Sequence, residues 1–402
     1  MEAERHRLAQ RLSQAVAGLP DPATPLVVVD LDAFDANAGD LVSRAAGKPL
    51  RVASKSLRVP ALVARALQLE GFAGVLAYTL REALWLARQR ISDDIVLGYP
   101  TVDRGALHDL LADPGARARV TLMVDDVAHL ALIRSCNTGG SGVRVALDVD
   151  AALRVGPSLV GPKRSPLREA SDVVRLARLL PEHGCTLVGL MTYEGQVAGV
   201  PDDVPHQRAR SLVVRKLKAA SLTQLGERRA ELLEALGAAG LRDQLEFFNA
   251  GGSGSVEATT CDASVTEIAA GSGLLVPGLF DHYLGFEPRP AAFYGLPVVR
   301  RPGDGVVTVA GGGFVASGAV GKDRAPIPWA PPDLQLTALE GAGEVQTPLT
   351  GPGTALLQIG DWVWFRHAKS GELAEHTNLV HLLAGEEIVE SVPSYRGLGL
   401  AW

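Results

Sequence analysis

The sequence predicts an α/β protein that consists of a parallel (β/α)8 barrel and a second, mainly antiparallel β domain. Between about residues 50 and 285, eight short β-type runs alternate with helix-period segments. These runs are rich in valine, leucine and isoleucine, as expected of strands buried on both faces of a parallel sheet. After about residue 290 the helical periodicity fades, and short strands separated by turn residues follow.

Each predicted barrel strand is followed by a segment of helical or loop character. The strands are Leu50–Ala53, Gly74–Tyr78, Ile95–Gly98, Val120–Val124, Val143–Asp148, Thr186–Thr192, Leu245–Asn249 and Ser264–Ile268. Helical periodicity is clearest in Val59–Gln68, Arg81–Gln89, Asp103–Ala112, Asp125–Arg134, Ser165–Leu180 and within Pro205–Ala239. An open doubly wound sheet is the competing fold, because it shows the same alternation.

The second domain is predicted from short strands with proline and glycine between them. These strands are Leu296–Val299, Gly305–Ala310, Thr354–Ile359, Trp362–Phe365, Leu379–Leu383 and Glu387–Val392, with an exposed loop at Pro326–Pro332. We expect the barrel to cover residues 30–287 and the β domain residues 288–402, with residues 1–29 as a further contributor. The β domain is expected to complete the active site.

The 402-residue chain has the composition of an ordinary globular protein, with 47% hydrophobic residues. Its net charge of −6 is dispersed, so we expect neither nucleic acid nor a membrane surface as a partner. Three scattered cysteines, Cys136, Cys185 and Cys261, fit a reducing compartment and predict a cytoplasmic protein. Met1–Leu19 predicts an amphipathic helix rather than a signal peptide.

Lys55 directly follows the first predicted barrel strand, and active sites of such barrels form at the C-terminal ends of the strands. A lysine amine in an apolar or cationic setting can lose its proton and attack a carbonyl group. The alternative is a solvated surface lysine. The loops after the seventh and eighth strands decide between these interpretations.

Those loops are rich in glycine and serine. Gly252-Ser253-Gly254 follows the seventh strand and Gly271-Ser272-Gly273 the eighth. Glycines let backbone N–H groups converge on an anion, and phosphate sites of many barrels lie at these two loops. One such loop is commonly a plain turn, but two on consecutive strands favour a phosphate site. With Lys55, they predict an enzyme that binds the aldehyde cofactor pyridoxal 5'-phosphate (PLP).

Three further residues are candidates for cofactor binding. Arg154 could bind the phenolate oxygen of the cofactor or a substrate carboxylate, or form a surface pair with Asp150. Tyr193 follows the sixth strand and could contact the cofactor ring, or it is buried aromatic packing. Tyr283 could add a hydroxyl to the phosphate site or pack between domains.

A metal site is a further candidate, in the segment Phe365–Asn378. His367 and Glu372, with His376 nearby, offer imidazole and carboxylate donors that suit Zn or Mn. A polar loop with an unrelated histidine is the alternative.

Taken together, these motifs resemble the fold-type III PLP enzymes, the alanine racemase-like superfamily, and within it the D-threonine aldolase and D-serine dehydratase branch. The resemblance covers nearly the whole chain and rests on these runs: Val29-Asp30-Leu31-Asp32, Ser54-Lys55, Asp148 to Gly156, Tyr193-Glu194-Gly195, Gly251 to Gly254 and His367-Ala368. It implies that Lys55 forms the internal aldimine and that Arg154 and Tyr193 flank the cofactor. It also implies that the two glycine-rich loops hold the phosphate, that His367 takes part in catalysis, and that the protein is a homodimer.

Two positions depart from the pattern of this branch. Lys369 stands where the branch usually has a second metal ligand, Asp or Cys, two positions after the histidine. Glu372 or His376 could replace that ligand, or Lys369 could replace the metal electrostatically. Ala151 stands where relatives usually have glycine.

The resemblance predicts a PLP-dependent lyase that cleaves β-hydroxy-D-amino acids by a retro-aldol reaction. A dehydratase that deaminates D-serine-like substrates is the nearest alternative. An amino-acid racemase would need a second Cα base opposite Lys55 and no metal. A non-catalytic PLP-binding protein is the alternative outside enzymes, and the substrate side chain is left open.

Overall fold

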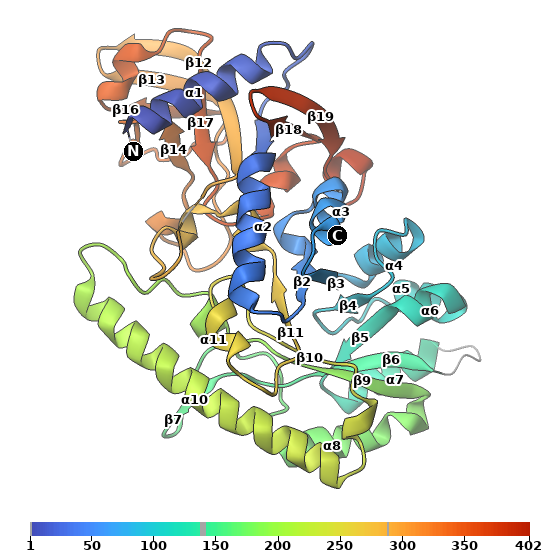
Figure 1. Cartoon of the computed structure of the whole chain (residues 1–402). Helices are drawn as coiled ribbons and strands as arrows, with labels where there is room; N and C mark the ends of the chain where they lie inside the picture. The colour runs from blue at the N-terminus through green and yellow to red at the C-terminus, as the bar shows by residue number, and fades with distance from the viewer. Residues whose placement is uncertain (1, 137–141, 288) are drawn as a thin grey trace.

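The structure is a computed structural model and describes residues 2–136, 142–287 and 289–402. In this part of the chain, eight parallel strands close into a barrel, and a separate, mainly antiparallel sheet forms next to it. The barrel and its helices occupy the lower part of Figure 1, and the second sheet the upper part. The predicted fold class is therefore confirmed, and the open doubly wound sheet is wrong.

The barrel strands follow one another around the barrel in chain order. They are β2 (Leu50–Ala53), β3 (Phe72–Ala77), β4 (Ile95–Leu97), β5 (Val120–Val124), β6 (Val143–Asp148), β9 (Cys185–Thr192), β10 (Phe247–Ala250) and β11 (Glu267–Ala270). Closure is made by β11 and β2, where Ala269 pairs with Arg51. Each predicted strand overlaps an observed one, and the last two begin two and three residues later than predicted.

Side chains of the barrel strands alternate between the interior and the surrounding helices, as the pleat of a strand requires. Met123 on β5 and Ala146 on β6 pack together inside the barrel. Their neighbours Leu122 and Leu147 belong to the main core under the helices. Every second residue of these strands therefore faces the barrel axis.

A buried ion network occupies the interior near the N-terminal ends of the strands. Arg51 binds Glu267 through Nε and Nη2, each at 2.7 Å. Its Nη2 also lies 2.8 Å from Asp94, and Asn249 donates to Glu267 at 2.9 Å. Because Arg51 and Glu267 are both nearly inaccessible to water, this network ties β11 to β2 across the closure.

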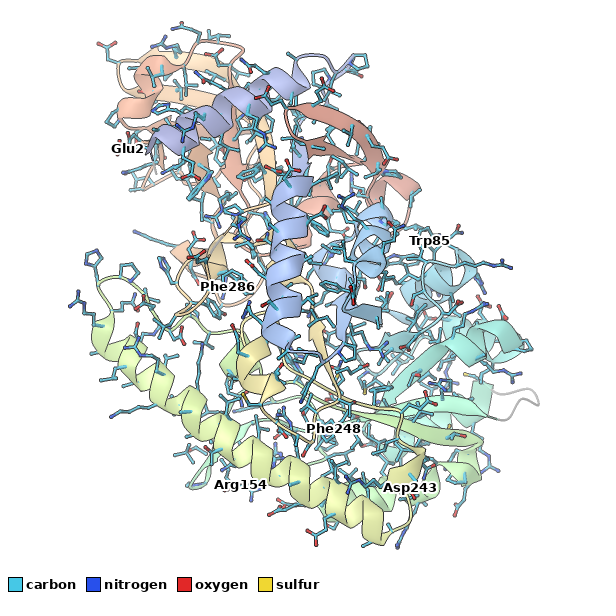
Figure 2. The ribbon with its side chains drawn as sticks, in the orientation of Figure 1. Glu2, Trp85, Arg154, Asp243, Phe248 and Phe286 are labelled. Carbon is cyan, nitrogen blue, oxygen red and sulfur yellow. The ribbon has the colours of Figure 1, made fainter. Side chains whose placement is uncertain are left out.

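Helices cover the outside of the barrel. They are α2 (Leu31–Ala45), α3 (Pro60–Gln68), α4 (Leu80–Arg88), α5 (Arg104–Ala112), α6 (Pro114–Arg119), α7 (Val127–Cys136), α8 (Ala170–Leu179), α9 (Gly195–Ala198), α10 (Arg208–Ala238), α11 (Val256–Thr260) and α12 (Ser272–Leu275). The long α10 runs along one outer side of the barrel (Figures 1 and 2). None of the helices in the described ranges is long and apolar enough to cross a membrane.

The second sheet combines the start of the chain with its last third. Its strands are β1 (Leu26–Asp30), β12 (Ala292–Gly303), β13 (Val306–Ala310), β14 (Ile327–Ala330), β15 (Gln335–Leu336), β16 (Gln346–Thr350), β17 (Trp362–Arg366), β18 (Leu379–Ala384) and β19 (Glu387–Pro393). The strand β1 lies between β12 and β18 and is parallel to β18. Helix α1 (Glu2–Val16) packs Leu12 and Val16 against Trp364 in this sheet.

Two predictions for this sheet are wrong. Pro326–Pro332 is not an exposed loop, because it contains β14, which pairs with β17 and buries alternate residues. Thr354–Ile359 is not a strand: Pro352–Leu356 forms a 3-10 turn that follows Gly351 at a φ of 118°. Residue 288, the predicted start of the second domain, lies outside the described residues.

Removing the cation from the barrel network should destabilise the protein strongly. We expect Arg51→Ala to lower the free energy of unfolding by about 3–5 kcal/mol, because the buried carboxylate of Glu267 loses its partner inside the barrel. Urea unfolding measures the change. As a control, Arg88→Ala removes a pair with Asp109 in which both side chains are about half exposed, and should change stability by less than about 1 kcal/mol. Equal effects of the two variants would contradict this account of the network.

Candidate active site

Lys55 lies in a single 3-10 turn, Ser54–Ser56, that directly follows β2. The turn carries the side chain to the C-terminal mouth of the barrel, where its Nζ donates a hydrogen bond to Tyr99 Oη at 2.6 Å. Tyr99 comes one residue after Gly98, just beyond β4. Active sites of such barrels form at the C-terminal ends of the strands, and this applies to Tyr99 as much as to Lys55. The sequence analysis missed Tyr99.

A guanidinium group lies next to this pair. Arg164 is 5.8 Å from the ring centre of Tyr99 and 5.2 Å from that of Tyr193. Burial raises the pKa of Tyr193, and the charge of Arg164 opposes that shift. Lys55, Tyr99, Arg164 and Tyr193 therefore form one polar cluster. Arg164 was also missed, because it lies on an irregular loop that offers no periodic signal.

The two glycine-rich loops meet at this cluster. A side chain at Gly252 would begin 3.6 Å from the Tyr193 ring. Ser253 Oγ accepts hydrogen bonds from the N–H groups of Gly271 at 3.3 Å and Gly273 at 2.9 Å. Ser272 Oγ lies 3.0 Å from Ser56 Oγ, next to Lys55. The structure thus brings the lysine turn and both loops together.

Some glycines of these loops have no room for a side chain. A Cβ at Gly254 would lie 2.3 Å from the carbonyl oxygen of Ala198, and one at Gly271 would lie 2.5 Å from that of Ala53. Only glycine allows such a close approach of two backbones.

A buried ion pair supports the first loop from behind. Glu194 and Arg229 lie 3.0 Å apart and are at most 2% exposed. Glu194 also accepts hydrogen bonds from the N–H of Gly251 at 3.1 Å and from Thr259 Oγ1 at 2.9 Å. Because Arg229 belongs to α10, the pair fixes the loop to the long outer helix.

Tyr283 lies next to the first loop, but its hydroxyl group is already bound. Its Oη donates to the carbonyl oxygen of Ala198 at 3.2 Å, and its ring stacks on Phe280. The ring would lie 2.7 Å from a Cβ at Gly254. Tyr283 thus packs against the predicted phosphate loop.

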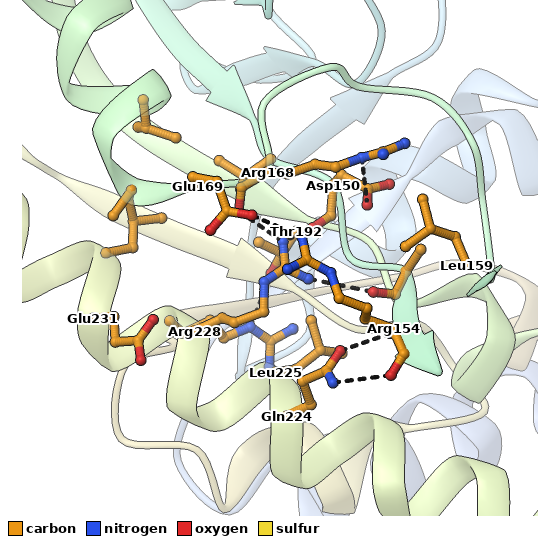
Figure 3. A pocket seen from close by; sticks show the side chains of 16 residues that line it. Asp150, Arg154, Leu159, Arg168, Glu169, Thr192, Gln224, Leu225, Arg228 and Glu231 are labelled. Atoms are coloured by element: carbon orange, nitrogen blue, oxygen red, sulfur yellow. Dashed lines mark hydrogen bonds and ion pairs between the residues drawn. The ribbon is translucent and has the colours of Figure 1, made fainter. Parts of the chain in front are cut away.

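The structure does not bring Arg154 to Lys55. Arg154 lies in a small ribbon of β7 (Leu153–Val155) and β8 (Ser158–Val160), and its backbone N–H binds Gln224 of α10. Its side chain is 56% exposed and pairs with Glu169 at 2.7 Å. Figure 3 shows it in a pocket of about 200 Å³ between this ribbon, α8 and α10. Arg164, and not Arg154, is the arginine next to Tyr193, because the ribbon turns Arg154 towards α10.

The donor set around His367 does not fit a divalent metal. Burial lowers the pKa of His367 to about 3, and the ring contacts Ser370 Oγ at 3.5 Å. Glu372 accepts a hydrogen bond from the N–H of Ser317 and lies 3.6 Å from Lys369. Across the described ranges, no group of three or more His, Cys, Asp or Glu side chains could hold a metal ion. The described residues therefore show no Mn or Zn site at His367 and Glu372, and that site stays a prediction.

The segment after His367 packs directly on the lysine turn. Ser370 Oγ donates to the carbonyl oxygen of Ser272 at 3.4 Å. A Cβ at Gly371 would lie 1.9 Å from the carbonyl oxygen of Lys55. The second sheet thus contributes backbone to the immediate surroundings of Lys55.

With this geometry established, the family follows from the match of residues 29–275 to the family described as alanine racemase, N-terminal domain. The chain belongs to this family. The family is PLP-dependent. Among curated proteins, none matches the chain in sequence.

Solved structures of this fold resemble the chain over nearly its full length. D-threonine aldolase from Filomicrobium marinum is 20% identical, with a TM-score of 0.77 over 93% of this chain and 95% of that one. D-threo-3-hydroxyaspartate dehydratase from Delftia sp. HT23 is 21% identical, with a TM-score of 0.70 over 94% and 98% of the two chains. An alanine racemase from Clostridium difficile 630 is 14% identical, with a TM-score of 0.58 over 92% and 98%.

Adding one methyl group at Gly371 should disturb the site. We expect Gly371→Ala to lower the free energy of unfolding by about 3 kcal/mol or more, because the new Cβ meets the Lys55 carbonyl oxygen and φ is +93°. The matched control is Gly385→Ala, where φ is also positive but nothing lies within 4 Å. That control should lose about 1–2 kcal/mol in the same denaturation experiment. Similar losses would show that the close approach to Lys55 is unimportant.

Proposed function

We propose that this protein is a PLP-dependent lyase that cleaves β-hydroxy-D-amino acids into glycine and an aldehyde. The observation that carries the proposal is the polar cluster at the barrel mouth, where the Lys55 amine meets Tyr99 at 2.6 Å beside two serine- and glycine-rich loops. A PLP site requires an amine that binds the aldehyde group of the cofactor and hydroxyl groups that bind its phosphate group.

The residues present fit PLP. Lys55 would bind its aldehyde carbon, and the hydroxyls of Ser56, Ser253 and Ser272 would bind its phosphate with the N–H groups of their loops. Arg164 would lie near the phenolate oxygen, the role expected of Arg154. Tyr193 would contact the ring, and Tyr283 would support the phosphate loop through its packing against Gly254.

Bound PLP supplies an electron sink for the bond that breaks at Cα. The side chains of this chain supply the rest. Lys55 Nζ would pass a proton to or from Cα, and the hydroxyl of Tyr99 keeps that nitrogen in place. The segment of Ser370 and Gly371 packs against the backbone of the lysine turn and would hold that turn in place.

Cleavage rather than dehydration is proposed on two grounds. The fold resembles a D-threonine aldolase, and position 369 carries lysine instead of the cysteine-type ligand of the dehydratase branch. Dehydration is the second candidate, because the fold also resembles a D-threo-3-hydroxyaspartate dehydratase. In that case the β-hydroxyl group leaves, and a keto acid and ammonia are released. A cytoplasmic homodimer is the proposed setting.

Covalent labelling tests the assignment of Lys55. After incubation with PLP and reduction with borohydride, we expect peptide mapping to find the PLP label on Lys55. Lys55→Ala should abolish the label. Lys48→Ala is the control, because Lys48 Nζ binds the carbonyl oxygen of Asp262, and it should keep the label. A label on another lysine would overturn the proposed site.

Product analysis tests the reaction. With D-threonine or a D-phenylserine as substrate, we expect glycine and the matching aldehyde in equal amounts. Chromatography for glycine and a coupled assay for the aldehyde measure both products. Keto acid and ammonia would establish the dehydratase instead, and appearance of the L enantiomer would establish a racemase.

A further inference from the structure

A second ionisable group faces the barrel mouth and has no role in the reaction as described so far. Asp148 is the last residue of β6 and is 8% exposed. Ala146, two residues earlier, faces the barrel interior, so the alternation of the strand turns Asp148 towards the axis as well. Among the described residues, no hydrogen bond or ion pair involves its carboxylate group.

The strand order places Asp148 across the mouth from Lys55. In the closed sequence β10-β11-β2-β3-β4-β5-β6-β9, β6 is four strands from β2 in either direction. A ligand held at Lys55 would therefore lie between the lysine and the wall that carries Asp148. Arg164 is the cation near Asp148, and it also lies over Tyr99 and Tyr193.

Burying an unpaired carboxylate costs free energy unless the group is protonated or a bound ligand pairs with it. The pKa of Asp148 is raised to about 7, mainly by burial and also by the nearby charge of Asp125, against the opposing effect of Arg164. Asp150 adds a small effect of the same sign as Asp125. Asp125, just after β5, lies 3.2 Å from His129 Nδ1, whereas Asp148 is left for a ligand.

The other candidate bases at the site are engaged or turned away. His367 is buried among apolar residues such as Leu57 and Leu275 and contacts Ser370. His376 stacks on Phe314, and Glu372 binds Ser317. Lys55 is needed at Cα.

We propose that Asp148 is the acid–base residue that takes the proton of the substrate β-hydroxyl group. This inference rests on the proposed lyase function and deepens it.

The step balances without a further reactant. The O–H bond breaks, its proton moves to Asp148 Oδ, and its electron pair becomes the second bond of the aldehyde carbonyl. The electron pair of the broken Cα–Cβ bond stays on Cα, and a proton from Lys55 Nζ completes glycine. Water then restores both groups, with the proton of Asp148 leaving and Lys55 regaining one.

Two reactions separate this role from a structural one. Exchange of the glycine α-proton in D2O needs PLP and Lys55 but no hydroxyl proton, whereas cleavage of D-threonine or D-phenylserine needs both. For Asp148→Asn we expect kcat of cleavage to fall about 100-fold or more, while glycine exchange and PLP binding, followed by absorbance, stay within a few-fold.

Asp150→Asn is the matched control. Asp150 is also buried and its pKa is raised by burial, but it lies 3.5 Å from Arg168 and lines the outer pocket. This variant should keep both reactions. Unchanged cleavage in Asp148→Asn, or equal loss of exchange and cleavage, would overturn the proposal. A wild-type protein that cleaves neither substrate would instead show that the proposed function is wrong, and the inference would fall with it.

The pH dependence of stability tests the placement of Asp148 without any reaction. Its pKa is raised from 3.8 to about 7 in the folded chain, so its contribution to stability is present below about pH 4 and lost as the pH rises to 7. Between these pH values the full chain without added PLP should lose stability relative to Asp148→Asn in urea unfolding. Parallel pH profiles of the two proteins would contradict the placement of this carboxylate.

Discussion

Closure of the barrel by β11 and β2 is the constraint on which the site depends. The pairing of Ala269 with Arg51 brings the turn after β2 next to the loop after β11. Because all eight strands are parallel, their C-terminal ends share one rim, and Lys55, Tyr193 and the glycine-rich loops meet there. The pleat of β6 turns Asp148 inward at the same rim. The lysine, the loops and the opposite carboxylate are thus consequences of one topology.

The loops at the rim are held by buried polar contacts behind them. Glu194 joins Arg229 of α10 to Gly251 and Thr259, and all these groups are buried. The protein is strongly destabilised when a buried pair of this kind loses one partner. The pair of Glu194 and Arg229 therefore favours a single position of the loop. This rigidity suits a phosphate site, because converging N–H groups must stay in place before the ligand arrives.

The barrel could be predicted from the sequence because its strands are buried on both faces, and such runs stand out against helical segments. The position of Lys55 followed directly from the strand that precedes it.

Arg154 was chosen for the same reason, but the short β7–β8 ribbon reverses its direction, and no local pattern shows this. Arg164 lies on an irregular loop whose path depends on tertiary contacts. The strand β14 was hidden by Pro328 within it and by the prolines around it, and an edge strand tolerates proline. Whether His367 and Glu372 share a metal could not be predicted firmly, because nearness in sequence does not by itself bring two side chains of a turn to one point.

The missing side chain at Gly371 has a consequence for how this family of two-part enzymes can change. The backbone at Gly371, in the second domain, packs directly against the peptide group of Lys55 in the barrel. No side chain lies between the two backbones that could adjust its position. A chimera that joins this barrel to the sheet of a relative would misplace the amine unless the donor sheet also presents a bare backbone at that point. Changes in the second sheet are therefore constrained by the position of Lys55, even though Gly371 and Lys55 lie more than three hundred residues apart in the chain.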